Sequence, residues 1–173
     1  MINVRRGAAP DAVTVAALAT QVFLDTYATG GVRPDLAREA FCEYSEQAFS
    51  RRFAETGRQF VIASLADAVV GFAEVLCFSC VSPVAGLSGA ELVRLYVQPR
   101  FQRTGVGRAL LQEAERLARL SSLHSLWLTA WDGNLSALAF YAPMGYADVG
   151  ATTYSFGGNT YGNRVLAKEV ALA

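Results

Sequence analysis

The sequence has very little histidine and cysteine, and this shortage excludes several kinds of catalytic site. It holds one histidine, His124, and three cysteines. A single histidine gives no persuasive Ser–His triad, and an odd number of cysteines without a spaced framework suits a reducing compartment. Cys77 and Cys80 have the spacing of a zinc or redox half-site, but the pair follows a predicted strand and enters a loop, not a helix. We therefore predict neither a metal site nor redox chemistry.

The sequence also lacks an excess of charge of either sign. Fifteen Lys and Arg residues balance fifteen Asp and Glu residues, which argues against broad attraction to nucleic acid. A local basic cluster at Arg100, Arg103 and Arg108 suits a small polyanion. No stretch approaches the ~20 apolar residues that span a bilayer, and residues 1–6 lack the apolar run of a signal peptide. We expect a cytoplasmic protein with neither a membrane nor a nucleic-acid partner.

Periodicity and turn residues divide the chain into strands and helices. A length of 173 residues favours one domain, residues 1–173. We predict helices from Asp11, as N-cap, to about Tyr27, over 34–57 as one helix or two, and over 104–120 and 134–144, where Pro143 can end the helix early. We predict strands over residues 2–6, 59–65, 69–78, 91–97, 125–130, 146–156 and 164–170.

The order of these elements indicates the fold class. The segment from residue 91 to residue 130 is a strand–helix–strand crossover, so its two strands should be parallel neighbours or near neighbours. The other connections have the lengths of hairpins. The prediction is an α/β (α+β) fold with a mixed, mostly antiparallel sheet of six or seven strands and helices on both faces.

Two glycines open the junction between the strand that ends at Val97 and the helix that follows. Because Gly105 and Gly107 have no side chains, several backbone N–H groups can point into one concavity at the positive end of the helix dipole. Such a place is suited to bind a pyrophosphate group, and Arg103 and Arg108 add cationic donors. The Walker and Rossmann patterns do not fit. Glycines that merely permit a tight turn are the alternative.

Two segments resemble the motifs of one enzyme family. The first is a strand with the core Leu95-Tyr96-Val97, followed by Gln102-x-x-Gly105-x-Gly107. The second places Asn134, Ala137, Phe140-Tyr141 and Gly145-Tyr146 in that order. Both are similar to the signature motifs of the GNAT superfamily of N-acetyltransferases. Within this superfamily, the chain looks closest to the polyamine (spermidine/spermine) acetyltransferase group that includes a bacterial protease-synthase and sporulation regulator, on the segments 94–97, 101–103, 126–131 and 150–156.

The resemblance implies a GNAT fold whose central parallel strands splay apart, with acetyl-CoA (coenzyme A) as cosubstrate and no metal. The pantetheine arm would lie between the parted strands, bonded by the backbone of Leu95 and Val97. The resemblance assigns the loop 102–108 to the pyrophosphate. The implied cofactor-binding residues are Leu95, Tyr96, Val97, Gln102, Arg103, Thr104, Gly105, Val106, Gly107, Arg108, Asn134, Ala137 and Tyr141.

The resemblance further implies direct attack of a primary amine on the thioester. An alkylammonium with a pKa near 10.4 is neutral in roughly one molecule per few thousand at pH 7, so a carboxylate, acting through a water, should take its proton. Glu91 and Glu74 are the first candidates, because adjacent strands could aim both at the splay, and Asp132 is a third. Each could equally be a solvated surface carboxylate.

The leaving thiolate needs an acid. Tyr141 lies where the family commonly has a tyrosine that protonates the sulfur of coenzyme A, and a phenol can donate to a strongly basic group. A core aromatic next to Phe140 is the alternative reading of this residue. The departure from the family pattern at Pro143 removes a backbone donor near the end of the same helix.

The acceptor side leaves alternatives open. The expected partner is a small-molecule amine, with a polyamine as one candidate, and a homodimer stays open. The chain could instead acetylate a protein N-terminus or an antibiotic amine, or be a non-catalytic acyl-CoA-binding regulator of the same fold. Acidic and aromatic residues such as Tyr27, Glu43, Tyr44 and Glu46 could line a pocket for a cationic substrate or form an ordinary helix surface.

Overall fold

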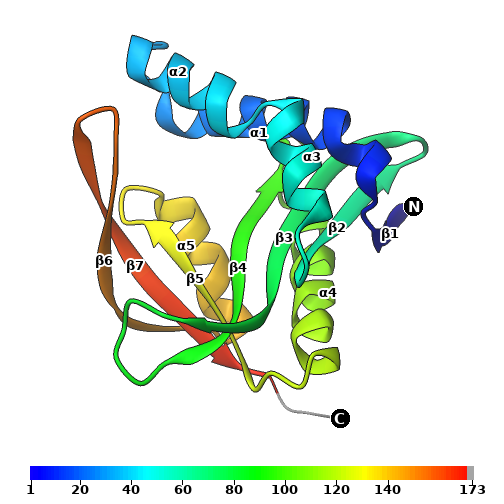
Figure 1. The fold of residues 1–173 in the computed structure, drawn as a ribbon, viewed down its shortest axis with the longest axis vertical. Helices are drawn as coiled ribbons and strands as arrows, with labels where there is room; N and C mark the ends of the chain where they lie inside the picture. The colour runs from blue at the N-terminus through cyan, green and yellow to red at the C-terminus, as the bar shows by residue number, and fades with distance from the viewer. Residues whose placement is uncertain (171–173) are drawn as a thin grey trace. The chain divides into compact units, whose positions relative to one another are not determined.

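The computed structural model describes residues 1–170, with the backbone alone at residues 79 and 156 (Figure 1). The chain divides into two units. The first unit comprises Met1–Val75 and Arg94–Ala114, and the second comprises residues 76–93 and 115 onward. Two strands, β3 (Ala68–Val81) and β4 (Ser88–Val97), and one helix, α4 (Val106–Leu120), belong partly to each unit.

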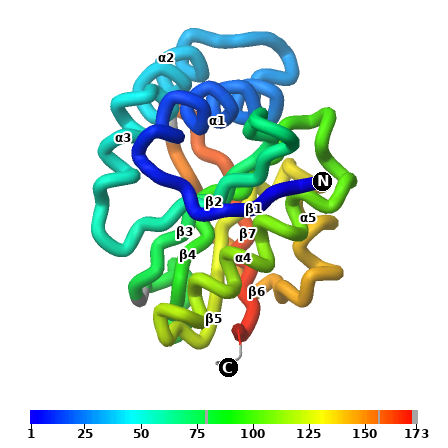
Figure 2. The backbone as a smooth tube through the Cα atoms, turned by 90° about the vertical axis from the view of Figure 1, so that its right-hand side faces the viewer, coloured from blue at the N-terminus to red at the C-terminus, as the bar shows by residue number. Residues whose placement is uncertain are grey.

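The first unit begins with strand β1 (Ile2–Arg6), which pairs antiparallel with β2 (Arg58–Leu65). The strand order within this unit is β1-β2-β3-β4. Between β1 and β2 the chain forms helices α1 (Ala12–Tyr27), α2 (Pro34–Glu43) and α3 (Glu46–Ala54), which lie together in Figure 2. The predicted helical region 34–57 is therefore two helices, separated at Tyr44 and Ser45, and Ser45 caps α3 by accepting a hydrogen bond from the amide of Ala48.

Alternating residues of β2 and β3 build a core on both faces of the first unit. The rings of Phe60 and Phe72 lie 6.2 and 5.9 Å from that of Phe49 in α3. The neighbouring Gly71 faces the other way, since a Cβ there would lie 2.8 Å from the carbonyl oxygen of Tyr96 and 3.1 Å from Leu110 of α4. Because successive side chains of a strand point to opposite faces, α3 and α4 cover opposite faces of this unit.

The second unit has the strand order β3-β4-β5-β7-β6. Strand β5 (Ser125–Trp131) pairs antiparallel with β7 (Asn159–Glu169), which in turn pairs antiparallel with β6 (Ala147–Phe156). Strands β4 and β5 are parallel neighbours, as the crossover predicts. Helix α5 (Leu135–Tyr141) follows β5. The described residues thus contain seven strands, mostly antiparallel, which confirms the predicted fold class.

Several predicted boundaries are wrong. Strand β3 extends to Val81 and β4 begins at Ser88, so the predicted loop 79–89 shortens to six residues, 82–87. Helix α4 begins at Val106, because the preceding Gly105 has a φ of +93°. Strand β7 begins at Asn159 rather than Arg164, because Gly157 and Gly158 both have positive φ and form a two-residue turn between Phe156 and Asn159.

Asp11 does not cap helix α1 with its side chain. Its carboxylate instead accepts hydrogen bonds from the amide of Ala8, at 2.8 Å, and from the guanidinium of Arg5. A short 3-10 helix, Ala9–Asp11, precedes α1 and occupies the position that the prediction gave to the cap. Among the helices of residues 1–170, none is long and apolar enough to cross a membrane.

Candidate functional site

The loop between β4 and α4 lies in the first unit and is exposed where it leads into the helix. We call residues 102–105 and the first turn of α4 the entrance of α4. Residues 102–105 are exposed, whereas the next residue, Val106, is buried. Arg103 and Gly105 have φ values of +60° and +93°, so the backbone turns sharply just before the helix. An added Cβ on Gly105 would meet no atom within 4 Å, which shows that the space beside this backbone is open.

Three local hydrogen bonds hold this loop in place. The Thr104 hydroxyl donates to the carbonyl of Phe101 at 2.7 Å, and the Gln102 side-chain amide donates to the carbonyl of Val97 at 3.4 Å. The amide of Ala109 donates to the carbonyl of Gly105 at 3.0 Å. The amides of the first helical turn before Ala109 are those that an α-helix leaves without an internal acceptor. The entrance of α4 can therefore bind an anion through backbone N–H groups.

The end of β4 contacts Tyr44, which lies between α2 and α3 and packs on α1. The hydroxyl of Tyr96 lies 3.2 Å from that of Tyr44, and burial raises the pKa of Tyr96 well above its ordinary value. Tyr44 stacks on Phe23 with ring centroids 4.7 Å apart. Tyr44, expected to line an acceptor pocket or lie on an ordinary helix surface, is thus buried, whereas Glu43 and Glu46 are exposed.

Glu74 is the centre of a buried ion-pair network in the first unit. Its side chain is 0% exposed, and its two carboxylate oxygens accept hydrogen bonds from Arg58 and Arg94, the latter at 2.6 Å. Arg94 also lies over the ring of Tyr44, 5.4 Å from its centroid. A general base must exchange protons with solvent or with the substrate. Both oxygens of Glu74 are occupied and enclosed, so this arrangement favours a structural role for this candidate base.

Glu91 lies in a different environment, in the second unit. It is half-buried on β4 and is the register partner of Trp127 on β5. The parallel register of these strands comprises two pairs, Ala90–Leu126 and Glu91–Trp127. In the described residues Leu92 and Val93 have no register partner on β5, although β5 continues to Trp131. The two strands are therefore joined over only a short stretch within this unit.

Helix α5 begins and ends at residues of the predicted site. The Asn134 side chain accepts a hydrogen bond from the amide of Ala137 at 3.1 Å, which makes Asn134 the N-cap. Tyr141 is the last residue of α5 and is 6% exposed. Burial raises the pKa of its phenol, so this group keeps its proton at neutral pH. Pro143 lies in a 3-10 turn, Ala142–Met144, so the helix ends early as predicted.

Tyr141 is oriented by ring packing. Its ring centroid lies 5.1 Å from that of Phe140 and 5.5 Å from that of Tyr146, both edge-on. The Tyr146 hydroxyl donates to Glu115 of α4 at 3.2 Å, and Lys168 donates to the same carboxylate oxygen at 2.8 Å. Burial, with the charge of Glu115, raises the pKa of Tyr146. This network was not predicted from the sequence. It holds the ring of Tyr146 in place against the ring of Tyr141.

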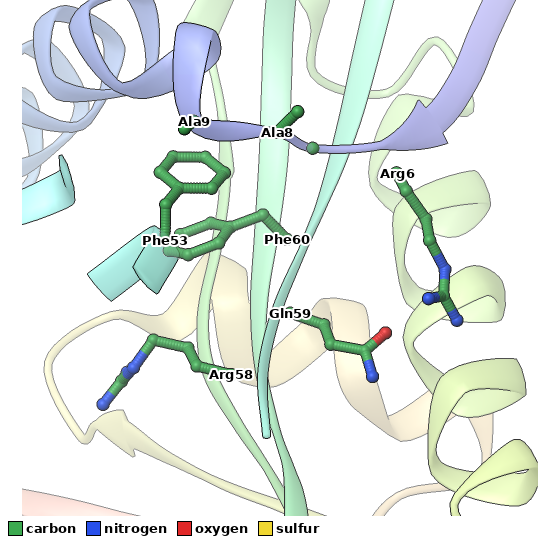
Figure 3. Close-up of a pocket in the computed structure, with 8 residues that line it drawn as sticks. Arg6, Ala8, Ala9, Phe53, Arg58, Gln59 and Phe60 are labelled. Carbon is green, nitrogen blue, oxygen red and sulfur yellow. The ribbon is translucent and has the colours of Figure 1, made fainter. Parts of the chain in front are cut away.

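Two hollows lie in the first unit. One, of about 570 Å³, is lined by Gln21, Asp25, Pro99 and Arg100, and its last two residues directly precede the exposed loop. The other, of about 120 Å³, is drawn in Figure 3. In that view the side chains of Gln59 and Arg6 lie on one side of β2 and that of Arg58 on the other.

Within the first unit, the structure brings together residues 95–97 and 102–108 of the predicted cofactor site. Within the second unit, it brings together Asn134, Ala137 and Tyr141 on one helix and places Glu91 on a strand. Asp132, the third candidate base, lies beside Gly162, where an added Cβ would come 2.3 Å from its Oδ2 atom. Among residues 1–170, no group of three or more His, Cys, Asp and Glu side chains could hold a metal ion.

Comparison with known proteins identifies the family. The model of the acetyltransferase (GNAT) family matches residues 25–146. An uncharacterized N-acetyltransferase of Lactobacillus delbrueckii subsp. lactis is 27% identical over 129 residues, which are 75% of each chain. The [ribosomal protein bS18]-alanine N-acetyltransferase of Escherichia coli is 35% identical over 60 residues, 35% of this chain and 40% of that protein.

Solved structures show the same fold. The PaiA N-acetyltransferase of Thermoplasma acidophilum in complex with coenzyme A has a TM-score of 0.78 at 20% identity, covering 98% of this chain and 99% of that one. The ribosomal-protein-alanine N-acetyltransferase of Brucella melitensis has a TM-score of 0.70 at 23% identity, covering 96% and 99%. The family model spans well over half of the chain. The protein therefore belongs to the GNAT family of acetyltransferases.

Proposed function

We propose that this protein transfers the acetyl group of acetyl-CoA to a primary amine by direct attack. The observation that carries this proposal is the exposed entrance of α4, with residues 102–105 accessible and Gly105 in a positive-φ conformation, in a chain of the GNAT family. On the sequence evidence, residues 1–173 form one acetyltransferase domain, and the enzyme acts in the cytoplasm.

The residues at the entrance fit a diphosphate. The amides of the first turn of α4 are directed out of the helix, and an added Cβ at Gly105 meets nothing within 4 Å. The exposed side chains of Arg103 and Arg108 add positive charge. We assign Gln102 through Arg108 to the pyrophosphate, and the backbone of Leu95, Tyr96 and Val97, with Asn134 and Ala137, to the pantetheine arm.

The bound cosubstrate supplies the acetyl thioester. Glu91, on β4 where the pairing with β5 is short, takes the proton of the acceptor amine through a water, because the ammonium form has no lone pair for attack. A backbone N–H near this point polarises the thioester carbonyl. Tyr141 keeps its proton at neutral pH, since burial raises its pKa, and gives that proton to the leaving sulfur. Glu74, whose carboxylate binds Arg58 and Arg94, has a structural role within the first unit.

Two classes of acceptor amine fit this proposal, polyamines and the α-amine of a peptide. The resemblance of segments 94–97 and 126–131 to polyamine acetyltransferases supports spermidine or spermine. The similarity to a bS18-alanine N-acetyltransferase over 60 residues supports an α-amine at a peptide N-terminus. The exposed acidic residue Asp25, which lines the larger hollow with Arg100, offers one carboxylate to either cation.

Release of free thiol from acetyl-CoA, measured against a panel of amines, tests the proposal. The panel contains spermidine, spermine, an alanine-starting peptide and alaninamide, with hydrolysis in the absence of amine as the blank. We expect amine-dependent thiol release and a stoichiometric acetylated product by mass spectrometry. Tight binding of coenzyme A without turnover on any amine would contradict the proposal and favour a non-catalytic acyl-CoA-binding regulator of the same fold.

A further inference from the structure

One carboxylate lies inside the second unit, where an ionised group is costly. Glu115 of α4 is 8% exposed, and its Oε1 atom accepts hydrogen bonds from the Nζ atom of Lys168 at 2.8 Å and from the hydroxyl of Tyr146 at 3.2 Å. Replacing a buried ion pair by apolar side chains of similar volume is often neutral or stabilising. Stability therefore explains this pair poorly, and the geometry that the pair fixes explains it better.

Lys168 of β7 holds Tyr146 from a second side. It is the only lysine of the chain, and 30% of its side chain is exposed. Its stem passes Gly145, where an added Cβ would lie 3.6 Å from the Cε atom, and its Nζ atom lies 5.7 Å from the centroid of the Tyr146 ring. A compact ammonium on a flexible stem can reach both this ring and Glu115, whereas the planar guanidinium of an arginine has a different shape. Tyr146 is thus held by its hydroxyl and by its ring face.

Tyr146 is joined to Tyr141 in two ways. Its backbone amide donates to the carbonyl of Tyr141 at 3.3 Å, across a turn that ends at Gly145 with a φ of +88°. The rings of the two tyrosines meet edge-on, with their centroids 5.5 Å apart. Because the two residues are in contact through backbone and ring, a displacement of Tyr146 is passed on to Tyr141.

The hydroxyl of Tyr141 depends on this packing for its direction. Burial alone raises the pKa of Tyr141, without a contribution from a hydrogen bond or a nearby charge. Among the described residues, the buried polar atoms that lack a partner belong to Gln59 and Trp127, so the Tyr141 oxygen is not fully enclosed. A phenol without a hydrogen-bond partner is aimed by its ring, which packs here on Phe140 and Tyr146.

We propose that Glu115 and Lys168 are positioning residues that set the direction of the Tyr141 hydroxyl toward the sulfur of coenzyme A. They act through the ring of Tyr146, which they hold by its hydroxyl and by its face. This inference rests on the proposed function, in which Tyr141 gives its proton to that sulfur. A misplacement of about 1 Å that originates far from the chemistry can lower a rate by about 100-fold.

A double variant separates this role from stability. Glu115→Leu with Lys168→Met removes both charges and keeps apolar side chains of similar size, so its melting temperature should equal or exceed that of the parent. We expect kcat to fall by about 10-fold, with the affinity for coenzyme A unchanged. The matched control, Asp148→Asn with Arg164→Gln, removes an exposed ion pair of the same unit and should leave kcat unchanged. A stable double variant with the kcat of the parent would overturn the proposal.

Two single variants grade the same contact if the double variant does not fold. Glu115→Gln keeps an acceptor oxygen for the hydroxyl of Tyr146, whereas Glu115→Leu has none. We expect kcat per folded molecule to decrease from the parent through Glu115→Gln to Glu115→Leu, in step with the contact to Tyr146. Equal kcat in all three proteins would contradict a positioning role.

The same double change in a Tyr141→Phe background shows whether the pair acts through the phenol. Residues that interact have non-additive effects, whereas the effects of independent residues add. If Glu115 and Lys168 act by directing the hydroxyl of Tyr141, the double change should lower kcat no further once that hydroxyl is gone. A further loss of about 10-fold would overturn the inference while acetyl transfer itself stands. An unchanged kcat in Tyr141→Phe alone would refute both the proton transfer and this inference.

The tyrosine ring resonances give a readout that does not need turnover. The chain has seven tyrosines, and the ring signal of Tyr141 in a sample with ¹³C-labelled tyrosine is the one that Tyr141→Phe removes. The double change at Glu115 and Lys168 should shift this signal, because the neighbouring ring of Tyr146 moves, and the control should not. An unchanged Tyr141 signal would overturn the proposal even if no amine is acetylated. A shifted signal without turnover on any amine would place the failure in the proposed function and not in the positioning.

Discussion

Two glutamates that look equivalent in the sequence occupy opposite environments in the structure. Glu74 on β3 is fully enclosed, with both oxygens bound by Arg58 and Arg94. Glu91 on β4 is half-buried and lies at the last pair between β4 and β5. A carboxylate held by two guanidinium groups stabilises its surroundings through charge, whereas a partly accessible one can exchange a proton. Position on a strand therefore does not by itself identify a general base.

The largest expected effect is that of Glu91→Gln on catalysis. Without a base, only the small neutral fraction of the amine can react, and kcat/KM at pH 7 should fall by about 10²- to 10⁴-fold. The deficit should shrink as the pH approaches the pKa of the amine, because the substrate then loses its proton without help. Steady-state rates from pH 6 to 10 measure this. An unchanged rate at pH 7 would remove Glu91 from the mechanism.

Glu74→Gln should act on stability instead. Removing one partner of a buried ion pair leaves uncompensated charge, which costs about 3–5 kcal/mol, and here two arginines lose their counterion. Urea unfolding should show this loss, while the activity per folded molecule stays near that of the parent. If Glu74→Gln is as stable as the parent but its kcat/KM no longer depends on pH, then Glu74 is the general base and Glu91 is not.

Tyr141→Phe should lower kcat by about 10²-fold with little change in the affinity for coenzyme A. Burial raises the pKa of this phenol above its ordinary value near 10, so the parent keeps the proton and should lose no activity from its titration below about pH 10. The same shift affects folding stability. The free energy of unfolding is unaffected by Tyr141 below the pKa of this phenol in the unfolded chain, and it falls as the pH rises from there toward the higher pKa of the folded state.

The smallest expected effect is that of Tyr146→Phe. This change removes the hydrogen bond to Glu115 and keeps the ring that packs on Tyr141. The loss of one hydrogen bond to a charged group costs about 1–3 kcal/mol, offset in part because Lys168 still binds Glu115. Thermal unfolding should therefore shift modestly. A fall in kcat larger than that of Tyr141→Phe would show that the hydroxyl itself takes part in proton transfer.

Local sequence signals predicted much of the fold. The Asn134 cap, the early end of α5 at Pro143 and the parallel pair β4–β5 depend on nearby residues or on crossover rules, and the structure confirms all three. The exposed turn at Gly105 follows from glycine at a strand-to-helix junction. The roles of the individual site residues in binding and catalysis stay predictions.

Other features depend on partners far away in the sequence. Arg58 and Arg94 lie 16 and 20 residues from Glu74, and no local pattern joins them. The Nε1 atom of Trp127 is buried and has no hydrogen-bond partner among the described residues, and this burial too depends on strands that are distant in the sequence. The early start of β7 at Asn159 is local instead, because it follows from the positive φ of the two preceding glycines, which the sequence permits but does not require.

The affinity of a Gly107→Glu variant for coenzyme A shows whether the entrance of α4 binds the diphosphate. A carboxylate in the first turn of α4 places bulk and negative charge where we assign the diphosphate. Gly30→Glu is the matched control, since Gly30 is exposed and a Cβ there meets nothing within 4 Å. Calorimetric titration should show no binding to the first variant and parental binding to the control, with both folded by circular dichroism. Parental affinity in Gly107→Glu would mean that the diphosphate does not bind at this helix entrance.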